Sequence, residues 1–256
     1  MTVTIYGPRE IAAIRVASRA AAATLAWVGA RLAPGVTTAQ IDAWVREDTA
    51  RRGGRPSQLG YHGFPASVCT SRNSVVCHGV PRADEQLRAG DIINVDVTTE
   101  IAGYHGDTSA TFCVGAVAAP VRALVDATEA ALVAAIAVVR PGARLGDIGA
   151  AIVGVARPAG LGVVDAFCGH GIGREMHEAP QVPHVGRAGT GLRLRPGMVF
   201  TVEPMLTQGG PETRVLADGW TAVTVDGMWS AQFEHTLCVT ADGVEVLTYR
   251  SEAELR

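Results

Sequence analysis

The sequence predicts an α+β fold made of two similar halves, in which a curved, mostly antiparallel sheet is backed by two pairs of helices. Three observations carry this prediction. The stretch LRAGDIINVDVT (87–98) aligns without a gap with LRPGMVFTVEPM (194–205), so that Leu87 corresponds to Leu194. At the same constant offset, APGVTTAQIDAWV (33–45) resembles RPGARLGDIGAAI (140–152). A long alanine-rich helical pattern precedes each member of this second pair.

Each half is predicted to begin with two helices. Helical patterns cover about 8–32 in the first half and about 119–139 in the second, and Pro-Gly follows each of them as a stop signal. A second helix, with a Thr or an Asp near its start, follows each Pro-Gly. The expected order in each half is therefore helix, turn, helix and then strands.

The strands continue the repeat with altered spacing. CHGVP (77–81) resembles GHGIG (169–173), and YHGDTSATFCV (104–114) loosely resembles QFEHTLCVT (232–240), which places Asp107 near Glu234. No Ser/Pro-rich linker separates the two copies. We therefore expect a single domain over 1–256 with pseudo-twofold halves at about 1–116 and 117–256.

Composition excludes several classes of protein. The formal net charge is −3 without a long basic run, so a nucleic-acid partner is not expected. No stretch of 18 apolar residues lacks a charge or a breaker, and the N-terminus lacks the order of a signal peptide, so neither a membrane span nor export is expected. The five cysteines are an odd number without a CxxC pair, which indicates reduced thiols in a cytoplasmic protein.

Two aspartates mark a predicted hairpin with strands near 91–99 and 104–114. A turn centred near Ile101–Ala102 places Asp96 opposite Asp107, with Cβ atoms about 4.5–5.5 Å apart. Two carboxylates that close repel each other in a core. The alternative is that one of them points to solvent.

The duplication favours a metal site, because it brings Glu203 and Glu234 toward the same axis. No lysine or arginine lies within these strand segments, and an unpaired buried carboxylate is costly. Four acids and one histidine are able to hold two divalent ions. His78 and His170, each in an H-G loop, are the candidate histidines, and a satisfied structural histidine is the alternative for either.

These motifs resemble those of a known family. NVDVT, HGDTSATF, GHGIGREMHEAPQV, TVEPM and QFEHT are similar to the motifs of the type I methionine aminopeptidases, in the short bacterial form without an N-terminal extension, and the resemblance covers almost the whole chain. It implies the pita-bread fold and the removal of an initiator methionine when the second residue is small. It also implies the metal ligands, with Asp96 on one ion, Asp107 and Glu234 on both, and His170 and Glu203 on the other.

The resemblance assigns catalytic roles as well. Glu203 would move a proton from water to the leaving amine, His177 would polarise the scissile carbonyl, and His78 would contact the scissile nitrogen. Four oxygen donors and one nitrogen suit Co, Mn, Fe or Zn. The implied substrates are the N-termini of nascent polypeptides, with a transient ribosome contact and a monomeric chain.

The residues that match the family's methionine pocket include departures from its usual pattern. Gln58 stands where Cys is common, Phe64 replaces a common Tyr, and Met176 replaces a common Phe after Glu175, where Gly is common. A flexible Met wall still suits a thioether. The implied substrate-binding set is His78, His177, Tyr61, Phe64, Cys69, Met176, Trp220 and Gln58. The backbone carbonyls of Asn73, Val75 and Ser230 match a monovalent-cation site.

Two other functions compete. X-Pro aminopeptidases and prolidases share the five ligands, but they normally carry an additional N-terminal domain, and VVCHGVP begins here already at Val75, which leaves room for two helices and little more. A non-catalytic binding module of the same fold would have lost ligands, whereas all five are present. HEAPQ (177–181) is not an HExxH zinc helix, because Gln181 replaces the second histidine and Pro180 breaks a helix.

Overall fold

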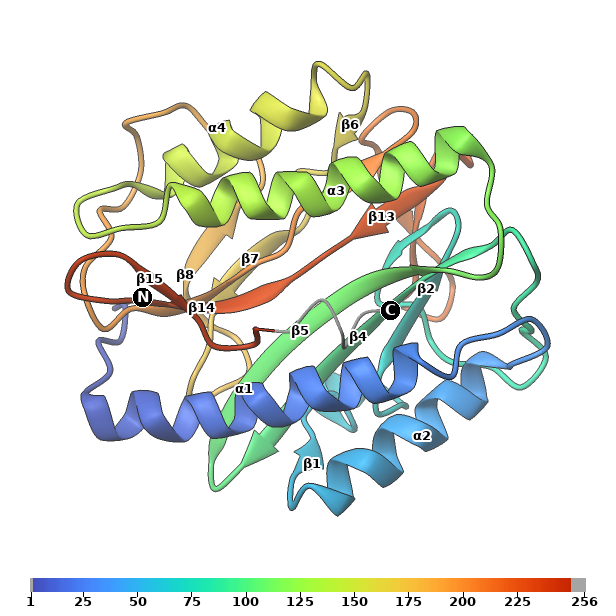
Figure 1. Cartoon of the computed structure of the whole chain (residues 1–256), viewed down its shortest axis with the longest axis horizontal. Helices are drawn as coiled ribbons and strands as arrows, with labels where there is room; N and C mark the ends of the chain where they lie inside the picture. The colour runs from blue at the N-terminus through green and yellow to red at the C-terminus, as the bar shows by residue number, and fades with distance from the viewer. Residues whose placement is uncertain (1, 250–256) are drawn as a thin grey trace.

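Two helix pairs flank the strands in the computed structural model, which describes residues 2–249. Figure 1 shows the first pair along one side of the molecule and the second pair along the other, with strands between them. The helices are α1 (Pro8–Gly29), α2 (Thr38–Arg51), α3 (Ala119–Ala137) and α4 (Leu145–Ala156), with a 3-10 turn, η1 (Tyr61–Gly63). This is the helix order that the sequence predicts.

Within residues 2–249, the strands group into four antiparallel ladders. One ladder surrounds β4, with β1, β2 and β5 as its partners; the others run β13-β10-β6, β11-β12-β3 and β15-β14-β9-β7-β8. The strands are β1 (Arg55–Pro56), β2 (Cys69–Arg72), β3 (Val75–Cys77), β4 (Ile92–Ile101), β5 (Tyr104–Cys113), β6 (Gly162–Val163), β7 (Cys168–Gly171), β8 (Glu178–Pro183), β9 (Val199–Val202), β10 (Met205–Thr207), β11 (Thr213–Val215), β12 (Ala222–Thr224), β13 (Ser230–Gln232), β14 (His235–Val239) and β15 (Val244–Val246).

The breaks between ladders occur at acidic residues. Glu203 and Pro204 interrupt an extended segment between β9 and β10, and Phe233 and Glu234 interrupt another between β13 and β14. Proline has no N–H to donate to a ladder. Glu203 therefore lies at a strand end where the regular pairing stops and its carboxylate is free to turn into the interior.

The internal repeat is visible in the hydrogen bonds. The Gly35 N–H donates to Leu87 O at 2.8 Å, and the Gly142 N–H donates to Leu194 O at 3.0 Å. The offset that relates Leu87 to Leu194 also relates Gly35 to Gly142. Isolated bridges follow the same rule, since Thr37 pairs with Gln86 and Arg144 pairs with Arg193. The sequence repeat is thus a structural repeat.

Side chains near the N-terminal ends fix where the second helix of each half begins. Thr37 caps α2: its hydroxyl accepts the Gln40 N–H at 3.1 Å, and the Gln40 side chain accepts the Thr37 N–H at 2.8 Å. In the second half, Asp147 accepts the Arg144 N–H at 2.7 Å. Asp147 is the counterpart of Gln40 in the repeat, so the two halves use equivalent positions.

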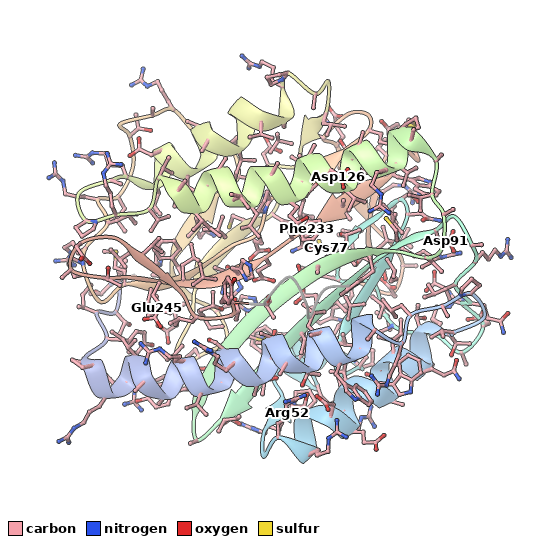
Figure 2. The ribbon with its side chains drawn as sticks, in the orientation of Figure 1. Arg52, Cys77, Asp91, Asp126, Phe233 and Glu245 are labelled. Carbon is pink, nitrogen blue, oxygen red and sulfur yellow. The ribbon has the colours of Figure 1, made fainter. Side chains whose placement is uncertain are left out.

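A continuous apolar core joins the helices to the strands of both halves, and its members include Leu25, Ile93, Leu124, Phe200 and Leu237. Figure 2 labels Phe233 and Cys77 between the two helix layers. Helix α1 is long and apolar enough to cross a membrane by length and composition, but half of that stretch is buried. It contacts β4 and β5 and holds Glu245 through Arg15 (Nε to Oε1, 2.6 Å), so it occupies the position of a core helix.

The cysteine expectation holds in the described residues. Cys69, Cys77, Cys113, Cys168 and Cys238 are all free thiols. The stretch that starts at His177 is extended rather than helical, because β8 begins at Glu178. It therefore lacks the helical geometry of an HExxH zinc site, as Pro180 predicts.

Candidate active site

A cavity of about 860 Å³ opens between the two halves. Its wall contains every residue for which the sequence predicts a metal or substrate role through a side chain. These are Asp96, Asp107, His170, Glu203, Glu234, His78, His177, Gln58, Tyr61, Phe64, Cys69, Met176 and Trp220. Residues from both halves of the chain thus share one surface.

Strand geometry supplies the acidic side chains. Asp96 lies in β4 and Asp107 in β5, while Glu203 follows β9 directly and Glu234 directly precedes β14. The two halves are joined here: the Asp107 N–H donates to Thr236 Oγ1 at 3.1 Å, and Thr236 Oγ1 donates to Asp107 O at 2.7 Å. These bonds hold the β5 backbone beside β14 and bring Asp107 next to Glu234, as the repeat predicts.

The predicted register of the hairpin was wrong by two residues. Asp96 faces Ser109 and Asp107 faces Thr98, because the turn lies at Ala102–Gly103 rather than at Ile101–Ala102. Both turn residues have positive φ (52° and 79°), as a two-residue type I′ turn requires, and Gly103 adopts this conformation without strain. A shift of two keeps side chains on the same face, so both aspartates still point into the cavity.

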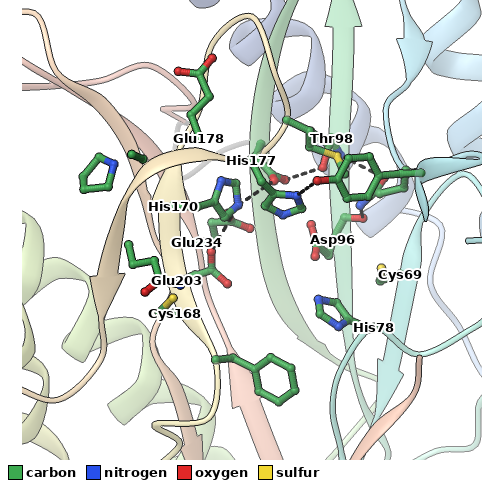
Figure 3. A pocket seen from close by; sticks show the side chains of 18 of the residues that line it. Cys69, His78, Asp96, Thr98, Cys168, His170, His177, Glu178, Glu203 and Glu234 are labelled. Atoms are coloured by element: carbon green, nitrogen blue, oxygen red, sulfur yellow. Dashed lines mark hydrogen bonds and ion pairs between the residues drawn. The ribbon is translucent and has the colours of Figure 1, made fainter. Parts of the chain in front are cut away.

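The donor atoms converge on one buried point, as Figure 3 shows for His170, Glu203 and Glu234. His170 Nε2 lies 3.7 Å from Asp107 Oδ2 and 3.7 Å from Glu203 Oε1. Single donor atoms of Asp107, His170 and Glu234 all lie within 4.8 Å of one another. Among the two candidate histidines, His170 is therefore the one that lies among the carboxylates.

Burial shifts the pKa values of these groups away from their charged forms. Desolvation raises the pKa of Glu203 to about 8, with the charge of Asp107 adding to it, and raises that of Asp107 to about 6. Burial and the charges of Asp107 and Glu203 raise the pKa of Asp96 well above its ordinary value. Burial lowers the pKa of His170 to about 3. The site therefore lacks positive charge.

The donor set fits divalent metal. No arginine or lysine is among the described residues of the cavity wall, and Asp96 Oδ1 is buried without a hydrogen-bond partner in the described chain. Four carboxylates and one imidazole nitrogen around one point are ligands that divalent ions accept. A bound cation would neutralise these carboxylates. Without it, burying them in their ionised form would destabilise the folded protein.

A second set of groups orients the donors. The Thr201 hydroxyl donates to Glu203 Oε1 at 2.9 Å and accepts the His170 N–H at 2.9 Å. Thr98 Oγ1 donates to Asp107 Oδ1 at 2.8 Å. His170 Nδ1 lies 3.1 Å from Gly171 O. Because a carbonyl accepts only, Nδ1 carries the proton and Nε2 faces the carboxylates with its lone pair.

Two further histidines lie at the cavity wall outside the carboxylate cluster. His177 Nδ1 lies 2.7 Å from Tyr61 Oη, and its ring centroid is 4.1 Å from that of His170. Burial lowers the pKa of His177 to about 4, and burial also lowers the pKa of His78. The Tyr61 hydroxyl is able to donate to Nδ1, which leaves the proton on Nε2 as a neutral donor toward the cavity.

An apolar pocket adjoins the carboxylates. Phe64 and Trp220 meet edge to face with centroids 5.2 Å apart, and the His78 ring lies 6.5 Å from Trp220 and 5.5 Å from Phe167. Cys69 and Met176 complete the wall and are buried. The pocket thus joins a loop of the first half to residues of the second.

Gln58 fills a gap along one edge of β4. Strand β1 pairs with positions 99–100 of β4, and β2 pairs with positions 93–96. Between them, Gln58 Nε2 donates to Asp96 O at 2.8 Å, and Gln58 Oε1 accepts the Thr98 N–H at 3.3 Å. The side-chain amide therefore replaces the missing strand beside the ligand-type residue Asp96 and holds the Tyr61 loop there.

Sequence reasoning missed several wall residues, among them Thr98, Phe167, Cys168 and Met205. Strand alternation would have found three of them, since Thr98, Cys168 and Met205 each lie two positions from Asp96, His170 or Glu203. Phe167 precedes β7 and carried no such signal. The three residues of the predicted monovalent-cation site, Asn73, Val75 and Ser230, lie outside the cavity wall. The Asn73 carbonyl accepts the Ser230 N–H at 2.9 Å, and β3, which begins at Val75, contacts β13.

Comparison with known proteins shows the family to which the chain belongs. Metallopeptidase family M24 matches residues 12–241. Methionine aminopeptidase A of Synechocystis is 51% identical over 247 residues, which cover 96% of this chain and 98% of that protein. The crystal structure of methionine aminopeptidase from Rickettsia prowazekii is 44% identical with a TM-score of 0.95, covering 97% of this chain and all of that one.

A peptidase of the competing class is less similar. The Xaa-Pro dipeptidase from Bacillus anthracis has a TM-score of 0.76 but is 22% identical, and this chain covers 62% of it. That similarity extends to the fold alone. The two methionine aminopeptidases instead match along nearly their own full length, and both are at least 44% identical to this chain. The chain therefore belongs to metallopeptidase family M24 and, within it, to the short, type I-like methionine aminopeptidases.

Proposed function

We propose that residues 1–256 form one catalytic domain whose five converging donors carry the activity of a methionine aminopeptidase. The chain is a hydrolase that removes N-terminal methionine. One observation supports the assignment of its site: four carboxylates and one imidazole line a single cavity that also contains an apolar pocket, and donor atoms of Asp107, His170 and Glu234 lie within 4.8 Å of one another. The pocket suits a thioether side chain, and the donors suit divalent metal.

The five donors would hold two divalent ions. Asp96 would be a ligand of one ion, His170 and Glu203 would be ligands of the other, and Asp107 and Glu234 would be shared. Co, Mn, Fe and Zn all accept this mixture of oxygen and nitrogen ligands. Bound ions would supply Lewis acidity and would acidify water near neutral pH. A monovalent cation would be held by the carbonyls of Asn73, Val75 and Ser230.

The chain's own groups handle the proton and the substrate. Glu203, with its two oxygens oriented by Thr201 and Gln232, takes a proton from the attacking water and delivers it to the leaving amine. His177 donates from Nε2 to the scissile carbonyl as negative charge develops there. His78 contacts the scissile nitrogen. Tyr61, Phe64, Cys69, Met176, Trp220 and Gln58 enclose the methionine.

The substrates are the N-termini of nascent polypeptides with a small second residue, because that residue must fit beside the metal donors. The enzyme acts as a monomer in the cytoplasm and contacts the ribosome transiently. The odd cysteine count and the free thiols are consistent with a reducing compartment.

A cleavage assay tests this function. Met-Ala-Ser, Met-Arg-Ser, Leu-Ala-Ser and Ala-Pro-Ser peptides are incubated with enzyme that has been stripped of metal and reloaded with Mn, Fe, Co or Zn. Release of methionine from Met-Ala-Ser alone is expected. Equal turnover of Met-Arg-Ser, or release of leucine, would refute the pocket assignment. Preferential cleavage of Ala-Pro-Ser would assign the X-Pro class instead.

A further inference from the structure

Two loops of the second half place arginines on one surface. The turn between α3 and α4 contributes Arg140 and Arg144, and the loop that follows β8 contributes Arg187, Arg193 and Arg195. We call these five residues the arginine rim. The loops lie side by side, since Arg144 pairs with Arg193 and the Leu194 N–H donates to Ala143 O at 2.7 Å.

The charge of the rim is largely uncompensated. None of its five arginines forms a salt bridge within the described chain, whereas Arg15, Arg55 and Arg82 each pair with a carboxylate. Four of the five are exposed, and Arg144 is half-buried with its guanidinium donating to Gly191 O. Asp147, in the first turn of α4, accepts the N–H groups of Arg144 and Gly189 and interacts electrostatically with Arg140 and Arg144, so it offsets part of the charge. The rim is basic on a chain whose net charge is −3.

The rim adjoins the catalytic cavity. Leu145 follows Arg144 directly, Leu192 precedes Arg193 directly, and both leucines line the cavity that also contains Glu203 and His177. The methionine pocket residues Tyr61 and Phe64 come from the first half of the chain, whereas the two leucines come from the second. When the first residue of a substrate occupies the methionine pocket, the residues that follow it can therefore extend along the second half of the cavity wall toward the rim.

The first half has no matching feature. In the repeat, the counterparts of Arg140, Arg144 and Arg193 are Ala33, Thr37 and Gln86, and only Arg195 has an arginine counterpart, Arg88. The backbone frame is the same in both halves. The positive charge is therefore not a requirement of the fold.

We propose that the arginine rim is a specificity element that favours substrates with acidic residues a few positions after the cleaved methionine. This inference rests on the proposed function. Guanidinium groups bind carboxylates in a bidentate manner, and a basic surface at a cavity raises the local concentration of acidic chains. A polypeptide is favoured over RNA as the partner, because the rim is continuous with a cavity that must hold a polypeptide and because the whole chain is acidic.

Matched peptides test the proposal. Met-Ala-Ser is extended with three Glu, three Gln or three Lys residues, and kcat/KM is measured at low and at high salt. We expect the acidic peptide to exceed the basic one by about 3- to 10-fold, mainly through KM, as for a few exposed ion pairs. The ratio should approach one in about 0.5 M salt, because screening shortens the electrostatic range. Measuring kcat/KM with the Glu residues at successive positions of the peptide identifies which substrate positions interact with the rim.

The protein-side variant replaces Arg187, Arg193 and Arg195 with Gln together. It should lose the acidic preference and keep the wild-type kcat/KM for the unextended Met-Ala-Ser. The matched control replaces three exposed arginines away from the rim, Arg31, Arg122 and Arg157, with the same change in net charge, and should keep the preference. Thermal unfolding of both variants verifies that they are folded.

The outcomes separate the competing explanations. An acidic preference that is absent in the wild type, or that persists in the rim variant, would overturn the proposal. Binding of a fluorescent RNA hairpin that the rim variant abolishes, without a preference among the peptides, would overturn it in favour of RNA. Failure of the wild type to cleave Met-Ala-Ser would instead refute the proposed function.

Discussion

The two halves of this molecule share a backbone frame but contribute different chemistry to the cavity. Equivalent bonds, Gly35 to Leu87 and Gly142 to Leu194, hold each helix pair to the loop that leads into its acidic strand. Beyond that frame they differ. Both halves contribute to the apolar pocket, but the first supplies two aspartates and His78, while the second supplies two glutamates, His170, His177 and the arginine rim. The repeated backbone places a carboxylate at an equivalent position in each half. The loops of the two halves have diverged, so different side chains surround each carboxylate.

The largest expected effect comes from a carboxylate at the junction of the halves. Glu234→Ala removes one of the two proposed shared ligands, so we expect loss of bound metal and a fall in kcat of more than about 100-fold, which is the size of losses from outer-shell changes alone. Metal content by mass spectrometry and turnover of Met-Ala-Ser measure it. Glu245→Ala is the control, since that carboxylate pairs with Arg15 elsewhere. Two ions per chain with normal turnover in Glu234→Ala would contradict the assignment.

The next effect separates the two histidines of the second half. His177→Ala should keep the metal and lose about 10²–10³-fold in kcat, the usual cost of one donor to a developing oxyanion. His170→Ala should lose metal. Tyr61→Phe keeps the ring but removes the contact at 2.7 Å with His177 Nδ1, and we expect a loss of about 10-fold, corresponding to one hydrogen bond. If His177→Ala loses metal instead, the roles of the two histidines are exchanged.

Proton competition compares the carboxylates of the two halves. In the metal-free protein the pKa of Glu203 is raised to about 8 and that of Asp107 to about 6. At a pH below its pKa, each carboxylate must lose a proton before it can bind metal. Metal affinity should therefore rise with pH between about 6 and 8, by up to about 10-fold per pH unit for each proton released. Calorimetric titrations in buffers with different ionisation enthalpies measure the released protons. Affinity that does not vary with pH over this interval would contradict the prediction.

The same pKa shifts determine the pH dependence of stability without metal. Because the folded protein binds these protons more tightly than the unfolded chain, the stabilisation is present at low pH and is lost as pH rises through about 6 and then about 8. The unfolding temperature of metal-free protein should therefore fall over that interval. Saturating metal should raise the unfolding temperature most at the alkaline end, where the carboxylates are ionised.

The smallest expected effect concerns the edge of β4. Gln58→Leu leaves Asp96 O and the Thr98 N–H without their partner, which costs about 1–3 kcal/mol of unfolding free energy. For a chain of this size we expect the unfolding temperature to fall by about 2–12 °C. Gln58→Glu, which keeps an acceptor for Thr98 but loses the donor to Asp96, should fall in between. Unchanged melting of Gln58→Leu would indicate that solvent replaces the amide.

Local sequence patterns were sufficient to predict the two-half architecture and the convergence of four acidic residues, whereas the family and the choice of His170 as the proposed fifth donor came from the resemblance of the motifs. The patterns are a repeat at one offset, helix patterns ended by Pro-Gly, and charged residues placed in otherwise apolar strands. Burying a charge without a partner is so unfavourable that the residue type alone predicts a ligand. Strand alternation adds the side of the sheet, which is why both aspartates entered the cavity although the hairpin register was predicted two residues away from its observed position.

The partners of these residues depend on the tertiary structure. The turn at Ala102–Gly103, rather than the acidic pair, sets the register, because backbone φ angles fix where a two-residue loop closes. The amide of Gln58 completes the edge of β4 between β1 and β2, and β4 is distant from Gln58 in the sequence. The arginine rim forms only when loops 140–144 and 187–195 pair, so neither segment reads as a long basic run. A surface such as the rim is created when segments distant in the sequence pair with each other. Neither the composition nor a local motif predicts which segments pair.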